Sequence, residues 1–337
     1  MKKIILNAVK FLVFLSLGVA LIWLVVKDLS EKDKVEIVRS ISEANYAWIG
    51  LAMVVGIVAH ISRAIRWKML LAPLELKPKL SNTFYAVMIG YLGNLAINRL
   101  GEVLRCGILR RYEKIPFVQS FGTVITERII DVILLLIVYI LGAWLEYDRM
   151  KTYIADNITT PFGNKMHKLT ANTTMFLLLL GIVAVVLILL FVFRKKIFQN
   201  PAVKKITTKA YSFWEGIRTV SKVKNPALFI FHSFFIWAMY LLSVYFCAFA
   251  FNETKTITIP DCLVIMAFGS LGVIATPGGI GAYQWIVLQI LTFWGYSTAM
   301  GVAFGWVVWL AQTIVVLAVG LFSFGMLAIN NKEKALS

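Results

Sequence analysis

Long apolar runs constrain this chain more than any other feature of its sequence. A helix that crosses a hydrocarbon core of about 30 Å needs roughly 20 mostly apolar residues, and several runs reach that length. Only 15% of the residues are charged, whereas soluble domains carry about 25%. The sequence therefore predicts an all-α polytopic membrane protein, a single transmembrane domain over residues 1–337. We predict six full spans, at about 4–26, 46–66, 118–145, 172–193, 227–251 and 299–329.

Two further apolar regions are broken in the middle. Residues 82–98 end at a break over Arg99–Glu102, and residues 261–275 end at a break over Thr276–Gly281. The pieces on either side of each break are near or below the length of a full crossing. They fit two re-entrant helical hairpins better than four tilted spans. The predicted hairpins cover residues 82–112 and 259–296.

The positive charges orient the chain. The net charge is +17, and most of the 34 Lys and Arg residues sit in short segments between apolar runs. This distribution is typical of cytoplasmic loops rather than of a nucleic-acid-binding surface. With both hairpins returning to the side they entered from, the cytoplasmic segments carry more than twice as many Lys and Arg residues as the outside loops. We predict a multi-pass protein of the cell membrane, with both termini in the cytoplasm.

This layout predicts two halves of opposite orientation. Residues 1–145 contain a cytoplasm-facing hairpin, and residues 172–331 contain an outside-facing one. The pattern Gly90-x-Leu92-Gly93 returns 179 residues later as Gly269-x-Leu271-Gly272. Interrupted hydrophobic segments at matching positions are typical of an inverted repeat with a binding site near the membrane midplane.

The segment 196–224 between the halves is basic and amphipathic. Apolar residues recur there at spacings of three and four, with Lys and Arg between them. Such a helix lies on the inner leaflet and is attracted to anionic lipid. It is a possible docking site for a soluble or membrane partner, or a mere connector, and the sequence is also compatible with a homo-oligomer.

Ionisable groups within membrane segments are costly unless paired or hydrated, so each is a candidate functional residue. Six of them follow the first break or lie in the next span: Arg99, Glu102, Arg105, Glu127, Arg128 and Asp131. Glu127 and Asp131 share a helix face, and their nearest predicted partners are Arg99 and Arg105. One interpretation is a buried charge network that holds an irregular loop. The other is that Arg99 or Arg105 binds a lipid phosphate through its planar guanidinium.

The second break supplies flexible backbone in place of charge. Pro277 cannot continue a helix, and Gly278, Gly279 and Gly281 can adopt positive φ. Exposed amides at the start of the next helix would favour an anion. The alternative is a tight turn without a ligand. Two uncharged hydrogen-bonding residues follow, Tyr283 and Gln284.

No cluster of residues indicates catalysis or metal binding. The three cysteines and three histidines lack ligand spacing, and no motif of a hydrolase, a metalloprotease or a nucleotide-binding loop is present. We expect no metal, no cofactor, no nucleic-acid partner and no enzymatic activity.

Three stretches together resemble a known family, and the resemblance covers essentially the whole chain in order and spacing. They are Asn98–Arg105, Glu127–Asp131 and Thr276–Gly281, and they are similar to the lysylphosphatidylglycerol synthase transmembrane region, also called the flippase-like domain family. The resemblance implies a bacterial or archaeal membrane protein that handles or flips lipids. Where the family has a basic and then an acidic residue after the last glycine, this sequence has Tyr283 and Gln284. The family pattern extends to Arg99, Gly101, Glu102, Arg105, Glu127, Arg128, Asp131, Pro277, Gly278, Gly279 and Gly281, with Gly101 and Pro277 as hinge or turn residues.

The family's two-domain members add a soluble aminoacyltransferase domain that makes the aminoacylated lipid. The sequence ends at Ser337, shortly after the last span, so we do not expect lipid aminoacylation. The leading hypothesis is a transporter that moves an anionic or polyprenyl-phosphate-linked lipid between leaflets. Its head group would be held by Arg99, Arg105, the glycine turn, Tyr283 and Gln284. The alternatives are an intramembrane transferase acting on a lipid-linked substrate and a non-transporting lipid-binding scaffold.

Overall fold

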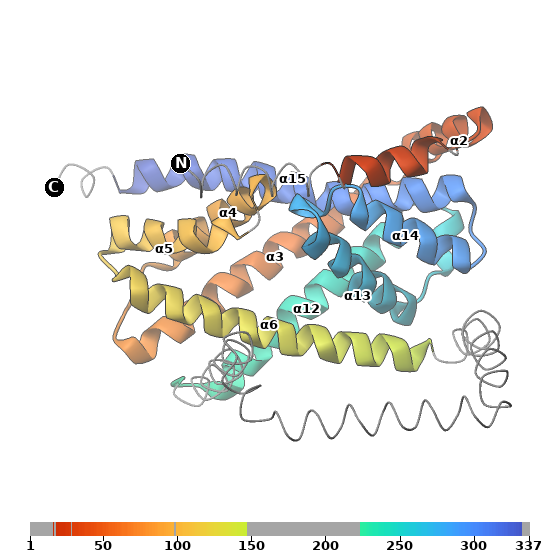
Figure 1. Cartoon of the computed structure of the whole chain (residues 1–337). Coiled ribbons are helices and arrows are strands. Elements are labelled where there is room, and N and C mark those ends of the chain that lie inside the picture. Colours follow the sequence, from red (N-terminus) through yellow and green to blue (C-terminus); the bar gives the residue numbers. More distant parts are fainter. Residues whose placement is uncertain (1–15, 17, 28, 98, 147–222, 332–337) are drawn as a thin grey trace, which may run out of the picture. The chain divides into compact units, whose positions relative to one another are not determined.

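The computed structural model describes residues 16, 18–27, 29–97, 99–146 and 223–331 (Figure 1). They form helices and turns, with no strand among them. The predicted span 172–193 lies outside the described residues, as do most of 4–26 and all but the last two residues of 196–224. Residues 143–218 form a unit of their own, of which only 143–146 are described. The account below concerns the other unit.

Three described helices are long and apolar enough to cross a membrane. They are α3 (Tyr46–Leu71), continued by the short helix η1 (Ala72–Leu74), α12 (Pro226–Ala248) and α15 (Thr298–Asn330). A fourth long helix, α6 (Phe117–Leu145), has 29 residues. These helices confirm an all-helical membrane protein, whereas the count of six spans stays a prediction.

Polar side chains mark where the helices begin. Asn45, Asn225 and Ser297 accept backbone N–H bonds at the starts of α3, α12 and α15. The short surface helix α2 (Glu31–Ser42) begins with a capping box, in which Ser30 and Asp33 bond each other's backbone N–H. Such caps satisfy amides that have no partner inside the helix.

Both broken regions form helical hairpins. Hairpin 1 consists of α4 (Leu80–Ala96) and α5 (Leu100–Glu113). Hairpin 2 consists of α13 (Ile259–Ala275), the turn η4 (Pro277–Gly279) and α14 (Ala282–Phe293). In each hairpin the two helices pack against one another. Each half thus has the same order: a long helix, a 17-residue helix, a shorter helix and a second long helix.

The backbone of the two hairpins matches residue by residue up to the turn. Both ends of α4 lie 179 positions before the corresponding ends of α13. Ile97 and Thr276 then leave the helix in extended conformations. Two residues later, Arg99 and Gly278 are both left-handed, with φ values of 68° and 62°. The offset found in the glycine pattern therefore extends to the conformation of the chain.

The glycines of that pattern bring the arms of each hairpin together. A Cβ atom on Gly90 would lie 3.0 Å from the carbonyl oxygen of Gly101, and one on Gly272 would lie 2.6 Å from the backbone nitrogen of Tyr283. Since no side chain fits between these backbones, glycine is required for the arms to pack so closely.

Helix α15 runs along both hairpins (Figure 1). Near its start Gly301 packs on Leu288 of α14, and further along Gly320 packs on Leu92 of α4. Between them the Trp309 indole donates a hydrogen bond to the carbonyl oxygen of Gly278 (2.7 Å). Gly278 in turn packs on Leu95 near the end of α4. The hairpins thus approach from opposite ends of α15, and their tips meet near its middle; their re-entry into a membrane stays a prediction.

Each hairpin also has its own apolar core. Hairpin 1 packs with α3 and the start of α6 around buried residues such as Trp67, Val87 and Leu109. Hairpin 2 packs with α12 and α15 around residues such as Ile265, Leu291 and Phe304. Helix α3 contributes buried residues to both cores, Ala52 to that of hairpin 2 and Trp67 to that of hairpin 1.

Candidate functional site

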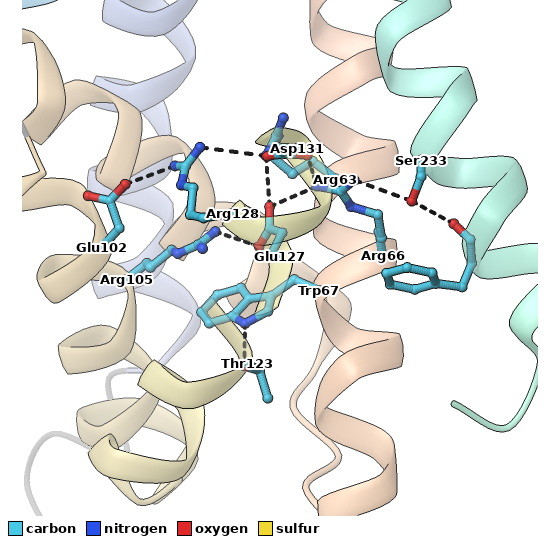
Figure 2. A network of polar contacts seen from close by, with 11 residues as sticks. Arg63, Arg66, Trp67, Glu102, Arg105, Thr123, Glu127, Arg128, Asp131 and Ser233 are labelled. Atoms are coloured by element: carbon cyan, nitrogen blue, oxygen red, sulfur yellow. Dashed lines mark hydrogen bonds and ion pairs between the residues drawn. The ribbon is translucent and has the colours of Figure 1, made fainter. Parts of the chain in front are cut away.

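A network of seven ionisable side chains joins α3, α5 and α6 (Figure 2). We call it the charge network. Its members are Arg63 and Arg66 from α3, Glu102 and Arg105 from α5, and Glu127, Arg128 and Asp131 from α6. It lies among helices with mostly apolar exteriors, where unpaired charges are costly.

Two arginines of α3 neutralise the carboxylates of α6. The Arg63 guanidinium lies 2.8 Å from Glu127 and 2.7 Å from Asp131. Arg66 lies 2.6 Å from Asp131 and 3.3 Å from Glu127. Arg66 and Glu127 are fully buried. The spacings explain the fit, because residues three or four apart on a helix present one face.

Arg105 reaches the same carboxylate from hairpin 1. Its Nη1 atom lies 2.9 Å from Oε2 of Glu127, and its guanidinium lies 4.7 Å from the centre of the Trp67 ring. Trp67 is itself fixed, since its indole N–H donates to Thr123 (2.9 Å). Arg105 is therefore held both by charge and by an aromatic face.

The open side of the network is formed by Arg128, whose side chain is 38% exposed. It lies 3.0 Å from Glu102 and 3.7 Å from Asp131. On the opposite side, Arg66 donates to the hydroxyl of Ser233 on α12 (3.3 Å). The network therefore spans from hairpin 1 across α6 and α3 to α12.

Positive charge exceeds negative charge in the network, with four arginines against three carboxylates. Arg105 has the most unused hydrogen-bond donors of the four arginines, because its Nε and Nη2 atoms are buried and find no acceptor within the described residues. Arg105 also lines a small cavity of about 10 Å³ together with Tyr91, Asn94, Gly101 and Arg128. A cavity of that size has room for about one water-sized group.

The predicted partners of the carboxylates were half right. Arg105 pairs with Glu127 as predicted, but Arg99 was wrongly predicted as a partner. Arg99 is exposed at the tip of hairpin 1, and no ion pair joins it to any other described residue. Its place is taken by Arg63 and Arg66, which lie at the end of the predicted span 46–66. Arg63 and Arg66 are three residues apart, and Glu127 and Asp131 are four apart, so each pair lies on one face of its helix. These spacings were the signal in the sequence that the two pairs could contact one another.

The glycine turn of hairpin 2 is a separate feature. Gly278, Gly279 and Gly281 all have positive φ, as predicted. Their backbone amides are largely used inside the hairpin: Gly279 N–H donates to Thr276 (3.0 Å), and Gly281 N–H donates to the side chain of Gln284 (2.8 Å). This bonding favours the tight-turn interpretation of the break.

The last two candidate residues lie inside hairpin 2. Tyr283 is buried against Gly269 and Gly272. Gln284 is buried too, and its Nε2 atom has no acceptor among the described residues. It faces a cavity of about 20 Å³ lined by Gly281, Trp306 and the helix over residues 18–27. Pro277 is buried directly after α13 ends, and Gly101 is buried against Gly90.

Metal binding has no geometric support in the described part of the chain. No group of three His, Cys, Asp or Glu residues there is placed to hold an ion.

Comparison with known proteins gives distant relatives. The chain is 22% identical to a UPF0104 membrane protein of Methanothermobacter thermautotrophicus, over 80% of this chain and 82% of the relative. It is 27% identical to the UPF0104 membrane protein MJ1595 of Methanocaldococcus jannaschii over 28% of this chain, and 26% identical to Glycosyltransferase AglD of Haloferax volcanii over 30% of it. These two matches cover only 30% and 16% of the relatives.

No solved structure matches the chain. The family described as Lysylphosphatidylglycerol synthase TM region, however, matches residues 7–320. That match includes both hairpins and every member of the charge network. The chain belongs to this family of membrane proteins.

Proposed function

We propose that the protein moves an anionic or polyprenyl-phosphate-linked lipid between membrane leaflets. One observation carries the proposal: the buried edge of Arg105, whose Nε and Nη2 atoms have no acceptor among the described residues, in a network with one more arginine than carboxylates. A phosphate oxygen pair matches that edge, because guanidinium groups bind phosphate through two parallel hydrogen bonds.

The network would also position the ligand. Glu127 and the ring of Trp67 hold Arg105 in place, so little conformational freedom is lost when a head group binds. Arg128 stands at the open side with a partly exposed guanidinium. Arg99 at the hairpin tip adds positive charge that would attract an anionic head group.

The hairpins supply the moving parts of this proposal. Their tips meet beside Trp309, and each would re-enter the membrane from its own side. Opening one tip and then the other would expose the head group to each leaflet in turn. The cavity beside Arg105 is too small for a head group, so the structure represents the closed state in this scheme.

We propose transport rather than catalysis. The oxygens of Glu127 and Asp131 lie within 3.3 Å of arginine nitrogens, so these carboxylates face their own network rather than a substrate. The relative named as a glycosyltransferase matches over only 16% of its length. The transferase alternative predicts conversion of a labelled lipid that is lost in Glu127→Gln.

The test is lipid exchange between leaflets in liposomes containing the purified protein. We expect exchange of a labelled anionic phospholipid to be faster than in empty liposomes, and to fall at least tenfold in Arg105→Gln. Arg110→Gln is the matched control, because Arg110 is exposed on the same helix. Exchange no faster than in empty liposomes would refute the proposal. A loss of function on deletion of 196–224, with Arg105→Gln harmless, would favour the scaffold.

A further inference from the structure

His60 is a buried ionisable residue that the charge network does not use. It lies on α3, one helical turn before Arg63, and only 3% of it is exposed. Both ring nitrogens are buried, and neither forms a hydrogen bond with any described residue. A buried polar atom without a partner loses its hydrogen bonds to water and gains none in return, so such a histidine in a core position calls for a reason.

Aromatic rings from two other helices cover His60. The ring of Tyr91 on α4 lies 4.6 Å from it, and the ring of Tyr240 on α12 lies 6.3 Å from it. Arg63, one turn further along α3, is close enough to act on the imidazole electrostatically. Tyr91 also lies under the Arg63 guanidinium, at 5.8 Å. One side chain of hairpin 1 thus covers both the histidine and an arginine of the charge network.

The position of Tyr91 ties this cover to the hairpin. Tyr91 follows Gly90, the residue at which α4 touches the backbone of α5. A movement of hairpin 1 away from α3 would therefore uncover His60 and Arg63 together. With the cover in place, an imidazolium would be buried near the Arg63 guanidinium without a hydrogen-bond acceptor among the described residues, which is strongly unfavourable.

We infer that His60 is a proton-binding site that controls the opening of hairpin 1. Neutral His60 is compatible with the closed hairpin, whereas protonated His60 requires water and favours the open one. The inference deepens the proposed transport function by naming what the motion responds to: a proton bound at the imidazole. The proton comes from water and returns to it when the hairpin closes.

The test measures the hairpin directly and needs no lipid transport. Spin labels are attached at two exposed positions, Val103 on α5 and Phe231 on α12, in a protein whose three native cysteines are replaced. The distance between them is measured at about pH 5 and about pH 8, on either side of the ordinary imidazole pKa of about 6.5. We expect a longer distance at the lower pH.

Two histidine variants make the test specific. His60→Gln should keep the short distance at both pH values, and His60→Lys should give the long one at both. His232→Gln is the control, because that imidazole is bonded to Ser62 (2.8 Å) and should leave the pH response intact. A distance that does not change with pH, or a change that persists in His60→Gln, would overturn the inference. Since lipid exchange is not measured, either result is independent of the proposed function.

Discussion

Hairpin 1 and hairpin 2 have nearly the same backbone but different chemistry. Their first helices both have 17 residues, both end in an extended residue, and both are followed by a left-handed one. At that last position hairpin 1 has Arg99 and hairpin 2 has Gly278. Hairpin 1 pairs its second helix with α6 through ions, whereas hairpin 2 packs its second helix into an apolar core. The comparison separates what the fold requires from what the site requires.

Glycine at the contact between the arms belongs to the fold, since both hairpins have it. The arginines of hairpin 1 and their carboxylate partners belong to the site, since hairpin 2 has no arginine and its carboxylate, Asp261, caps the start of α13. The turns differ in length as well, with three residues from Ile97 to Arg99 but six from Thr276 to Gly281. The three extra residues of hairpin 2, residues 279–281, follow Gly278, whose carbonyl oxygen accepts from Trp309.

The largest effect should come from removing Glu127, the α6 carboxylate that holds hairpin 1 through Arg105. Glu127→Ala leaves three buried arginines with one partner fewer, and breaking such a buried pair typically costs about 3–5 kcal/mol. We expect a marked drop in the thermal unfolding temperature in detergent. Glu31→Ala, which removes an exposed pair with Lys34, should change stability by about 0–1 kcal/mol. Equal effects of the two would show that the network does not hold hairpin 1.

The second largest loss of stability should come from the glycines at which the two helices of each hairpin touch. Gly272→Ala places a methyl group 2.6 Å from a backbone atom that cannot move freely, and overpacking of this kind costs about 1–3 kcal/mol or more. Gly90→Ala should be milder, because its nearest atom lies at 3.0 Å. Gly107→Ala is the control: its Cβ would meet nothing within 4 Å, so it should stabilise α5 by about 0.5–1 kcal/mol. Unfolding temperatures of the three variants would rank them.

A third effect concerns the place where the tips meet. Trp309→Phe removes the donor to the Gly278 carbonyl and should cost about 1–3 kcal/mol if that oxygen stays buried. It should also raise hydrogen exchange in the tip of hairpin 2 more than in the base of either hairpin. Trp306→Phe tests the specificity, because Trp306 lies one turn earlier and lines the cavity beside Gln284 instead. If hydrogen exchange instead rose equally along all of α13, the bond between Trp309 and Gly278 would not stabilise the tip in particular.

The sequence predicted the positions of both breaks, because they depend on local residue types, whereas the re-entry of the hairpins into a membrane stays a prediction. Pro277 and its glycines stop a helix wherever they occur, and a charge such as Arg99 interrupts an apolar run. The cap between Gly281 and Gln284 was not predicted, although Gln three residues after a helix N-cap is a known capping pattern.

The partners of the carboxylates could not be predicted in the same way. Hydropathy treats Arg63 and Arg66 as the end of a span, yet α3 continues to Leu71. Their burial depends on Glu127 and Asp131, which lie more than 60 residues later in the chain. Such pairing is decided by how α3 and α6 pack, and one sequence does not contain that information.

The smallest effect tests the left-handed residue that the hairpins share. A non-glycine residue in that conformation costs roughly 1–2 kcal/mol, so Arg99→Gly should raise the unfolding free energy by about 1 kcal/mol. Lys114, at φ 55° after α5, gives a matched control: Lys114→Gly relieves similar strain away from the tip. If Arg99 serves only the fold, the two variants should be equally stable and equally active. We expect instead that Arg99→Gly is stabilised but exchanges anionic lipid more slowly than Lys114→Gly, because a strained cation at the meeting point of two hairpins is retained for its charge and not for its backbone.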